Sequence, residues 1–478
     1  DTGQPAELAR RLSRAAVLKR RQPLQQQLHN IYFDTPTQQL RRARAALRLR
    51  RVDAAGGTRW LQTLKTGAAQ EHALSQRGEW ETPVAGAALQ SDALDARAWA
   101  RIDPDGRLFR ALAPCFVTDF TRTIWRVRRR DGSVVEVALD IGSVTQGERS
   151  APICELELEL KAGPVAALFD VAEKIAATVP AWPSGMSKAQ RGYALAADAP
   201  CAPTMSTPPR LSRGMPVRDA ARRLLREMFG QFSAHLNTVY HGDDPEVVHQ
   251  ARVAWRRLHS TLRLFRSVLP EGGPPDWTAL KPLQRLLGGL RDLDVARTHT
   301  LPPLRDAFVA GSADRAQAWD ATMDALQQAG HAQRSAVRQA LQDPSVGLCL
   351  LQAVRWLEPA ATPADTQHAG DRPLARWARR HTTKLHARLK RARRTAHDAR
   401  VLHKVRLLAK RTRYAIEALH RVLPQHMRHK WHRAAVELQQ RIGAERDLAQ
   451  AIGLLARIEA PDDLTAYLRG VVAGRSLR

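Results

Sequence analysis

The stretch Cys154-Glu155-Leu156-Glu157-Leu158-Glu159-Leu160-Lys161 alternates charged and apolar side chains over most of its length. Because successive residues of a β-strand point to opposite faces of a sheet, this alternation predicts a strand with one charged face and one apolar face. The leucines are expected to pack in the core of a domain. The three glutamates and Lys161 then share the opposite face, where they can form a site.

The residues before this stretch repeat the same pattern. Short runs with apolar residues at every second position extend from Leu28 to about Val144, and turn signals such as Gly56-Gly57 and Asp131-Gly132 separate them. A helical pattern follows near Val165 to Ala177, so we expect an α+β domain with an antiparallel sheet. The charged residues on these strands are Arg48, Arg50, Lys65, Glu79, Glu81, Arg122, Glu136 and Asp140.

A sheet with one charged face is expected to close into a barrel or tunnel that gathers both signs of charge inside. Carboxylates there can hold a hard divalent cation, and arginine and lysine can hold phosphate oxygens. A solvated face is the simpler interpretation of any one such strand. Its repetition over five strands favours metal-assisted transfer of a phosphoryl group to water.

Two further regions follow this first domain, which we place at residues 1–196. Residues 197–216 are rich in proline and small residues, which predicts a linker. Helical periodicity then continues to the end of the chain, so residues 217–478 are predicted to form an all-α domain. A break at residues 358–373 divides this domain into repeats at about 217–357 and 374–478, which we interpret as two duplicated helical bundles.

The two repeats share a basic motif at a constant offset. His249-Gln-Ala-Arg252-Val-Ala-Trp-Arg256-Arg257 in the first matches His403-Lys-Val-Arg406-Leu-Leu-Ala-Lys410-Arg411 in the second. Spacings of three and four place most of these residues on one helix face. The candidate anion-binding residues are His249, Arg252, Arg256, Arg257, Arg263, His403, Arg406, Lys410, Arg411 and Arg413.

A solvated face is again the simpler interpretation of one arginine-rich helix. However, Asp398 is the only acidic residue between Arg372 and Arg413, and the basic stripe occurs in both repeats. Both observations favour an anion-binding track, because guanidinium groups stay charged and can contact two phosphate oxygens at once.

The composition also indicates a polyanionic partner. Lys and Arg number 75 against 47 Asp and Glu, a net charge of +28, which fits polyphosphate, nucleic acid or an anionic membrane. Aromatic residues make up 5% of the chain, which disfavours stacking on single-stranded bases. The four cysteines lie far apart, so we expect neither disulfides nor a zinc site built from cysteines. This cysteine usage is typical of a protein in a reducing cytoplasm. No apolar run is long enough to predict a membrane span.

The first domain resembles the CYTH domain, the triphosphate tunnel family of inorganic triphosphatases, thiamine triphosphatases and a class of adenylate cyclases. The similarity rests on Tyr32-Phe33-Asp34-Thr35-Pro36, Leu61-Gln62-Thr63-Leu64-Lys65-Thr66, the Glu155–Lys161 strand and Ser187-Lys188-Ala189-Gln190-Arg191-Gly192-Tyr193. It implies a Mg²⁺ or Mn²⁺ cofactor. The implied phosphate ligands are Arg48, Arg50, Lys65, Arg122, Lys161, Lys188 and Arg191. The implied metal or water ligands are Glu155, Glu157, Glu159, Glu79, Glu81, Glu136 and Asp140, with Glu157, Glu159, Lys65 and Arg122 as catalytic candidates.

One feature of that family is not found in this sequence. Its members begin with a strand carrying Glu-x-Glu-x-Lys, and no such strand precedes Gln4. The sequence also begins without methionine. We therefore expect a fragment of a longer chain; the alternative is a protein that binds triphosphate through an incomplete metal site and turns it over poorly.

The helical domain resembles the CHAD domain over Val217 to about Leu455, on the paired basic motifs and on Arg291-Asp292-Leu293 and Arg446-Asp447-Leu448. That resemblance implies binding of inorganic polyphosphate. The combination predicts a bacterial, cytoplasmic inorganic triphosphatase, associated with polyphosphate granules, that cleaves tripolyphosphate to pyrophosphate and phosphate. The alternatives are a protein that only binds polyphosphate or nucleic acid, and an enzyme acting on thiamine triphosphate or as an adenylate cyclase.

Overall fold

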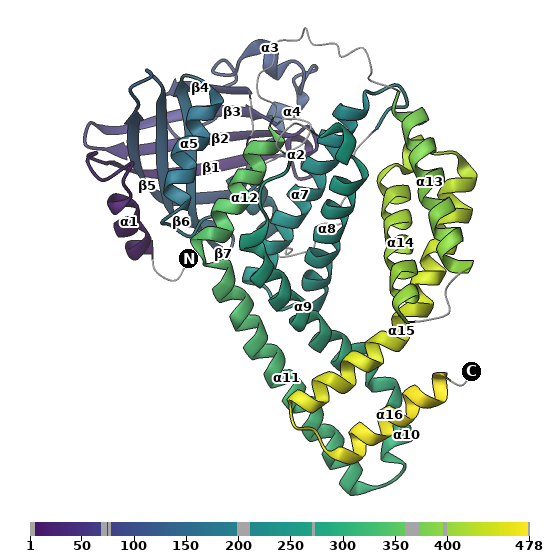
Figure 1. The fold of residues 1–478 in the computed structure, drawn as a ribbon. Coiled ribbons are helices and arrows are strands. Elements are labelled where there is room, and N and C mark those ends of the chain that lie inside the picture. The colour runs from purple at the N-terminus through teal and green to yellow at the C-terminus, as the bar shows by residue number, and fades with distance from the viewer. Residues whose placement is uncertain are drawn as a thin grey trace. The chain divides into compact units, whose positions relative to one another are not determined.

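The computed structural model describes residues 5–67, 74, 78–197, 211–269, 273–358, 373–394 and 399–476, without the side chains of residues 399–403, 441–446, 475 and 476. The chain forms two compact units (Figure 1). One comprises Asp1–Ala202 and Gln342–Arg355, and the other comprises Pro203–Leu341 and Trp356–Arg478. Most of the predicted linker, residues 198–210, and most of the predicted break, residues 359–372, lie outside the described residues.

The first unit is built on an antiparallel sheet of seven strands in the order β4-β3-β2-β1-β5-β6-β7. This confirms the predicted α+β class. The strands are β1 (Leu24–Asp34), β2 (Ala45–Ala54), β3 (Gly57–Thr66), β4 (Gly78–Val84), β5 (Ala113–Arg128), β6 (Val134–Gln146) and β7 (Arg149–Ala162).

Helices cover the apolar face of this sheet. Leu12 of α1 (Pro5–Arg14) and Val171 of α5 (Val165–Ala176) are buried with Leu139 of β6, and the leucines of β7 pack beside them. The short helices α2 (Gln39–Arg42), α3 (Ala96–Trp99) and α4 (Arg107–Arg110) contribute to a second cluster over β2 and β3. The predicted division of β7 into a core face and a charged face is therefore observed.

The helix α6 (Lys188–Ala196) packs against the charged face near one end of the sheet. Ser187 caps it in a capping box with Gln190, and the Tyr193 hydroxyl donates a hydrogen bond of 2.6 Å to Asp34. A Cβ atom on Gly192 would lie 2.2 Å from the Phe116 ring, so this close approach requires glycine. These contacts hold the first turn of α6 against the charged strands.

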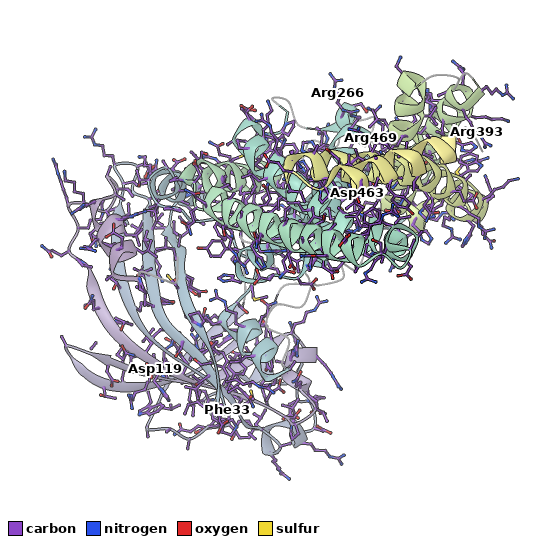
Figure 2. All side chains as sticks on the ribbon, turned by 90° about the horizontal axis from the view of Figure 1, so that it is seen from below. Phe33, Asp119, Arg266, Arg393, Asp463 and Arg469 are labelled. Atoms are coloured by element: carbon purple, nitrogen blue, oxygen red, sulfur yellow. The ribbon has the colours of Figure 1, made fainter. Side chains whose placement is uncertain are left out.

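The second unit is helical, and one of its core clusters contains residues from both halves. Its main helices are α7 (Val217–His241), α8 (Pro245–Leu264), α9 (Lys281–Val295), α10 (Arg305–Val309), α11 (Ala313–Leu341), α13 (Leu374–Arg394), α14 (Ala399–Ala418), α15 (His432–Arg457) and α16 (Asp462–Ser476). Phe265 of the first half stacks on Trp377 of the second at 4.7 Å between ring centroids. Exposed arginines such as Arg266 and Arg393 project from its surface (Figure 2).

The helix α12 (Pro344–Leu357) follows α11 but belongs largely to the first compact unit. Arg355 pairs with Asp170 at 2.9 Å and with Glu173 at 3.2 Å, both on α5. A Cβ atom on Gly347 would lie 2.0 Å from the Ala181 carbonyl oxygen, so the backbones are in close contact there. Among the described residues, no helix combines the length and apolar character that crossing a membrane requires.

Candidate active site

Strand register places the predicted charged residues on one face of the sheet. Arg122 lies opposite Asp140, which lies opposite Glu155, across β5, β6 and β7. On the other side of β1, Thr63 lies opposite both Arg48 and Glu81. Since alternate residues share a face, the candidates on β2 through β7 all project from the surface that α6 partly covers.

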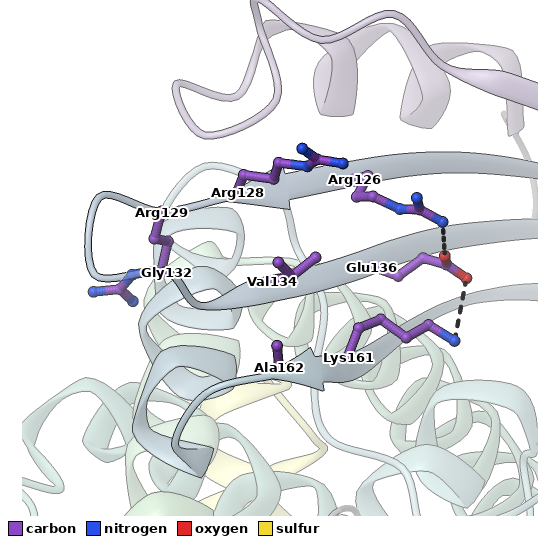
Figure 3. A pocket seen from close by; sticks show the side chains of 8 residues that line it. All are labelled: Arg126, Arg128, Arg129, Gly132, Val134, Glu136, Lys161 and Ala162. Carbon is purple, nitrogen blue, oxygen red and sulfur yellow. Dashed lines mark ion pairs between the residues drawn. The ribbon is translucent and has the colours of Figure 1, made fainter.

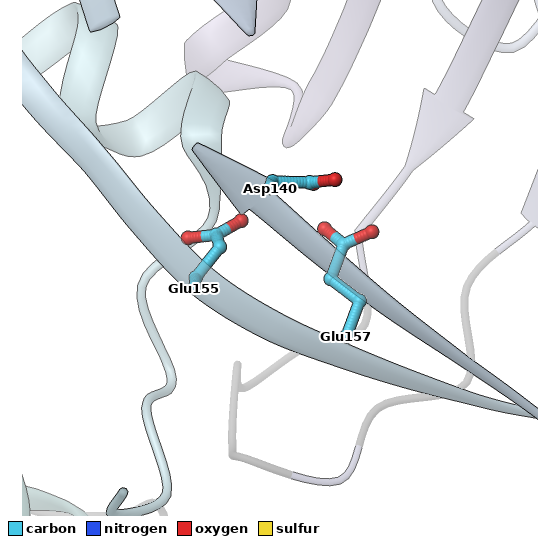
Figure 4. Close-up of side chains that lie close together, drawn as sticks. All are labelled: Asp140, Glu155 and Glu157. Carbon is cyan, nitrogen blue, oxygen red and sulfur yellow. The ribbon is translucent and has the colours of Figure 1, made fainter. Parts of the chain in front are cut away.

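Three carboxylates converge on this surface. Asp140, Glu155 and Glu157 each offer an oxygen, and these oxygens lie within 4.8 Å of one another (Figure 4). Asp140 is fully buried. The guanidinium of Arg122 donates two hydrogen bonds of 2.7 Å to Asp140 and a further one to Glu157. A fully buried carboxylate is stable here because this two-pronged contact satisfies both of its oxygens.

The first turn of α6 supplies two more cations to the same carboxylates. Lys188, which is 6% exposed, places its Nζ 2.6 Å from Asp140 and 2.8 Å from Glu157, and it also contacts Glu155. Arg191 contacts Glu155 through Nη2. The cluster therefore joins residues from three strands and one helix into a single network of ion pairs.

This network keeps its members charged. Burial alone would lower the pKa of Lys188, but Glu157, Glu155 and Asp140 raise it above its ordinary value. Burial likewise would raise the pKa of Glu157, but Lys188 and Arg122 hold it well below its usual range. Glu157 is therefore ionised at neutral pH, which is the state that binds a metal ion.

Strands β2 to β4 form a more cationic wall. Lys65 pairs with Glu79 at 2.9 Å, whereas Arg48 lies 3.6 Å from Glu79, and the Nε of Arg48 has no hydrogen-bond partner in the described part of the chain. Arg50 donates a hydrogen bond of 2.7 Å to Asn30 and lies 3.9 Å from Glu81. The cations of this wall are thus incompletely matched by carboxylates.

The pKa values on this wall reflect the crowding of positive charge. Burial and the neighbouring Arg48 lower the pKa of Lys65 to about 8. Burial, Arg48 and Arg122 lower the pKa of Arg50 to about 9. Arg122 lies close enough to Arg50 to repel it, and Lys65 lies close enough to Glu157 to attract it. The wall therefore faces the carboxylate cluster. An anion bound between them would relieve the repulsion.

The other predicted metal ligands lie outside the carboxylate cluster. Glu79 and Glu81 contact the cations of β2 and β3. Glu159 pairs with Lys161 at 2.7 Å, and Glu136 lies 3.6 Å from Arg126 and 4.0 Å from Lys161. Arg126 is not among the residues predicted from the sequence, although it lies four residues beyond Arg122 and therefore on the same face of β5.

In the helical unit, the basic residues of both halves meet where α8 packs on α14. Arg257 of α8 lies 3.3 Å from Glu417 of α14, which also accepts a hydrogen bond of 2.7 Å from Arg413. Burial and the nearby Arg263 lower the pKa of Arg411, so like charges from the two halves approach each other. His432 completes the contacts of Glu417 at 3.2 Å.

The remaining stripe residues differ in how far the structure describes them. Arg252 donates a long hydrogen bond of 3.4 Å to the Gln284 carbonyl, beside Gly288 of α9. Burial and Arg291 lower the pKa of His249. Arg256, Arg406 and Lys410 also lie on α8 and α14, whereas the side chain of His403 lies outside the described residues.

Comparison with known proteins gives two family matches. Residues 6–193 match the CYTH domain, and residues 223–456 match the CHAD domain. An inorganic triphosphatase of Haemophilus influenzae is 35% identical over 169 residues, which are 35% of this chain and 46% of that protein. The chain thus spans about half the length of this curated relative.

Two solved structures are also similar to parts of the chain. The CHAD domain of the plant Ricinus communis is 28% identical with a TM-score of 0.49, covering 58% of this chain and 92% of that one. A Hippeastrum protein named as an adenylyl cyclase with a dominant triphosphatase activity is 17% identical with a TM-score of 0.26, covering 39% of this chain and 90% of that one.

Proposed function

Because the chain carries a CYTH domain followed by a CHAD domain, we propose that it is a metal-dependent inorganic triphosphatase with a C-terminal polyphosphate-binding module. The reaction would cleave tripolyphosphate to pyrophosphate and phosphate. The observation that carries the proposal is the carboxylate cluster of Asp140, Glu155 and Glu157 facing the cations of β2 and β3. The similarity of the chain to a curated inorganic triphosphatase supports the same class of reaction.

The carboxylate cluster fits a divalent cation. Its donors are three carboxylate oxygens close enough to share one ion, and hard cations such as Mg²⁺ and Mn²⁺ prefer oxygen ligands. A bound ion would neutralise phosphate charge and make a coordinated water easier to deprotonate. Asp140, Glu155 and Glu157 are the residues that would hold it.

The cations around the cluster would bind the phosphate chain. Arg48, Arg50 and Lys65 project from one wall and Arg122 from the other, so a linear polyanion between them can be contacted from both sides. The unpaired Nε of Arg48 is a buried donor that a phosphate oxygen would satisfy. These side chains would hold the reacting phosphate in place and stabilise the charge that develops on the leaving group.

Two catalytic candidates have unequal support. Glu157 lies in the carboxylate cluster, whereas the side chain of Glu159 is 66% exposed and is paired with Lys161. We therefore assign Glu157 to holding the metal or orienting the attacking water. Lys65, with a pKa of about 8, would be largely protonated at neutral pH and would act as a charge on the phosphate chain.

The helical unit would bind long polyphosphate through the basic residues of α8 and α14. Burial and the nearby guanidinium of Arg263 lower the pKa of Arg411, so Arg263 disfavours the charge on Arg411. A phosphate chain lying over both halves would offset that repulsion. Its binding would weaken with salt through the release of counterions.

The test measures phosphate release and ligand binding by the full chain with Mg²⁺ or Mn²⁺. Substrates are tripolyphosphate, pyrophosphate, long-chain polyphosphate, ATP and thiamine triphosphate. Cleavage of tripolyphosphate to pyrophosphate and phosphate is expected. Preferential cleavage of thiamine triphosphate, or formation of cyclic AMP, would replace inorganic triphosphate by an organic substrate, and binding without cleavage would reduce the protein to a binding module.

The matched variants are Glu157→Gln and Glu148→Gln. Glu148 is an exposed residue in the turn between β6 and β7, outside the carboxylate cluster. The variant Glu148→Gln therefore removes one carboxylate charge away from the site. We expect Glu157→Gln to lower turnover by about a hundredfold or more while tripolyphosphate binding changes much less. Equal turnover in the two variants would remove Glu157 from the reaction.

A further inference from the structure

A groove lies at the end of the sheet that is distant from the carboxylate cluster along β5 and β6. It has a volume of about 650 Å³, and its lining comes from the end of β5, the β5–β6 turn, the start of β6 and the end of β7 (Figure 3). The lining residues are Arg126, Arg128, Arg129, Gly132, Val134, Glu136, Lys161 and Ala162.

The groove contains more positive than negative charge. Four of its lining residues are cationic and one, Glu136, is acidic. Glu136 lies 3.6 Å from Arg126 and 4.0 Å from Lys161, longer than the roughly 2.7–2.9 Å of a strong charge-assisted hydrogen bond. In the part of the chain that the structure describes, no carboxylate pairs with the side chain of Arg128. Arg126 and Arg128 therefore have no carboxylate closer than 3.6 Å among the described residues, whereas Lys161 pairs with Glu159 at 2.7 Å.

The charge of Arg129 is also already matched. It donates a hydrogen bond of 2.7 Å to Asp170 of α5, and Asp170 is also bound by Arg355. This pairing fixes one wall of the groove. The cations of the groove without a close carboxylate are then Arg126 and Arg128, with Glu136 as a weakly held counter-ion, and Lys161 would bind an anion by leaving Glu159.

The groove continues the surface of the active site. The pair Arg126–Glu136 lies four residues along the strands from the pair Arg122–Asp140, about 13 Å away on the same face. Between them lie Ile124 and Ala138, and Glu157 of the carboxylate cluster lies opposite Ala138 on β7. The groove is therefore a second group of cations on the same face, in line with the active site along β5 and β6 and beside Glu157 of the carboxylate cluster.

Resting on the function proposed above, we propose that this groove binds the distal phosphates of an inorganic polyphosphate chain whose end occupies the active site. Arg126, Arg128 and Lys161 would contact the phosphate oxygens. Glu136 would give up its weak contacts with Arg126 and Lys161, and Lys161 would exchange its ion pair with Glu159 for one with phosphate. The groove then makes chains longer than tripolyphosphate bind more tightly in the tunnel unit. Glu136 is in this assignment a counter-ion of the groove rather than a metal ligand.

The test uses chemical acetylation of lysines in the full chain, located by mass spectrometry, because this method reports on single residues and separates the two units. Lys161 reports on the groove and Lys65 on the active site, while the exposed Lys174 of α5 is an internal control. The probes are tripolyphosphate, pyrophosphate and a linear polyphosphate several units longer, with gel analysis to check that the chains stay intact. The longer chain is expected to protect Lys65 and Lys161, and tripolyphosphate to protect Lys65 alone.

Paired double variants test which residues bind. Arg126→Gln/Arg128→Gln removes two groove cations, and Arg97→Gln/Arg110→Gln removes two exposed arginines of α3 and α4 near the opposite face. Half-protection of Lys161 by the longer chain is expected to need a concentration about tenfold higher in the groove variant. In the control variant this concentration should stay the same. In both variants tripolyphosphate still protects Lys65.

The outcomes separate the two proposals. If tripolyphosphate fails to protect Lys65 in the unaltered chain, both the proposed function and the groove fail. If Lys65 is protected but the longer chain leaves Lys161 as reactive as Lys174, the groove proposal alone is wrong. Protection of Lys161 by pyrophosphate at concentrations that leave Lys65 reactive would also overturn it, because the groove would then bind a separate anion rather than a continuous chain.

Discussion

Replacing Lys188 by methionine tests the ion-pair network at the centre of the site. The Nζ of Lys188 lies 2.6 Å from Asp140, which is fully buried, and Lys188 itself is 6% exposed. Breaking a buried ion pair by removing one partner costs about 3–5 kcal/mol, because the other charge stays buried. Asp140 keeps its two hydrogen bonds to Arg122, so we expect the lower end, about 3 kcal/mol.

Native-state hydrogen exchange of peptides from β5 to β7 measures this cost within the first unit alone. Since about 1.4 kcal/mol corresponds to a factor of ten, amides that exchange through opening of these strands should exchange about a hundredfold faster in Lys188→Met. The control is Lys174→Met, an exposed lysine on α5. Equal exchange rates in the two variants would refute the view that Lys188 neutralises Asp140.

The same variant makes a prediction about pH. Because the pKa of Glu157 is lowered in the folded protein, its stabilising contribution is present at neutral pH and is lost as the pH falls through the folded pKa. Lys188, whose pKa is raised, contributes fully below its unfolded pKa and therefore throughout this range. Without Lys188 the pKa of Glu157 rises towards its ordinary value. Lys188→Met should thus lose less stability than the unaltered protein on acidification below about pH 4.

Three further measurements test other parts of the structure. Tripolyphosphate affinity, measured by calorimetry, should fall as the pH rises through about 8, which is the pKa of Lys65. The variant Lys65→Arg should remove this fall. If the variant keeps the pH profile of the unaltered chain, Lys65 is excluded from the phosphate site. Gly192→Ala places a methyl group 2.2 Å from an aromatic ring of β5, so we expect a loss of about 1–3 kcal/mol and faster exchange in α6, and unaltered exchange would contradict the close packing. Arg263→Gln/Arg411→Gln should weaken binding of long polyphosphate and reduce its dependence on salt, whereas Arg305→Gln, an exposed single change, should do neither.

The sequence was sufficient to assign charged side chains to one face of each strand. The alternation in β7 predicted that Glu155, Glu157 and Glu159 share a face, because a strand offers only two faces. It could not predict that Asp140 joins the first two. That contact depends on the register between β6 and β7 and on Arg122 from β5.

The sequence also could not predict that Glu157 belongs to the carboxylate cluster and Glu159 does not. Both lie on the same face of β7, so periodicity treats them alike. Glu159 forms an ion pair of 2.7 Å with Lys161, two residues away on the same strand. Glu157 instead forms an ion pair with Lys188 of α6, which lies 31 residues further along the chain. Contacts between elements so distant in sequence leave no periodic signal.

In the helical unit, spacing predicted which side of each helix is basic but not how the halves combine. Glu417 interrupts the basic stripe of the second repeat. In the structure it contacts Arg257 from the first repeat as well as Arg413 and His432 from its own. The duplication was visible in the sequence, whereas the shared core of Phe265 and Trp377 was not.

The contacts of Lys188 also bear on how metal and phosphate binding are related. In the structure Lys188 and Arg122 neutralise the three carboxylates that would hold a divalent cation. Neither side chain can bind a phosphate oxygen at full strength while these contacts persist, because each cation would be shared between two anions. Lys188 and Arg122 would be released towards phosphate only when another cation neutralises the carboxylates. Metal and tripolyphosphate should therefore each increase the affinity for the other, and by linkage the two increases must be equal. Calorimetric titrations of Mn²⁺ with and without tripolyphosphate measure this coupling. It should shrink in Lys188→Met, where the carboxylates bind metal without first releasing an ammonium group, and a coupling as large as in the unaltered chain would show that Lys188 does not link the two ligands.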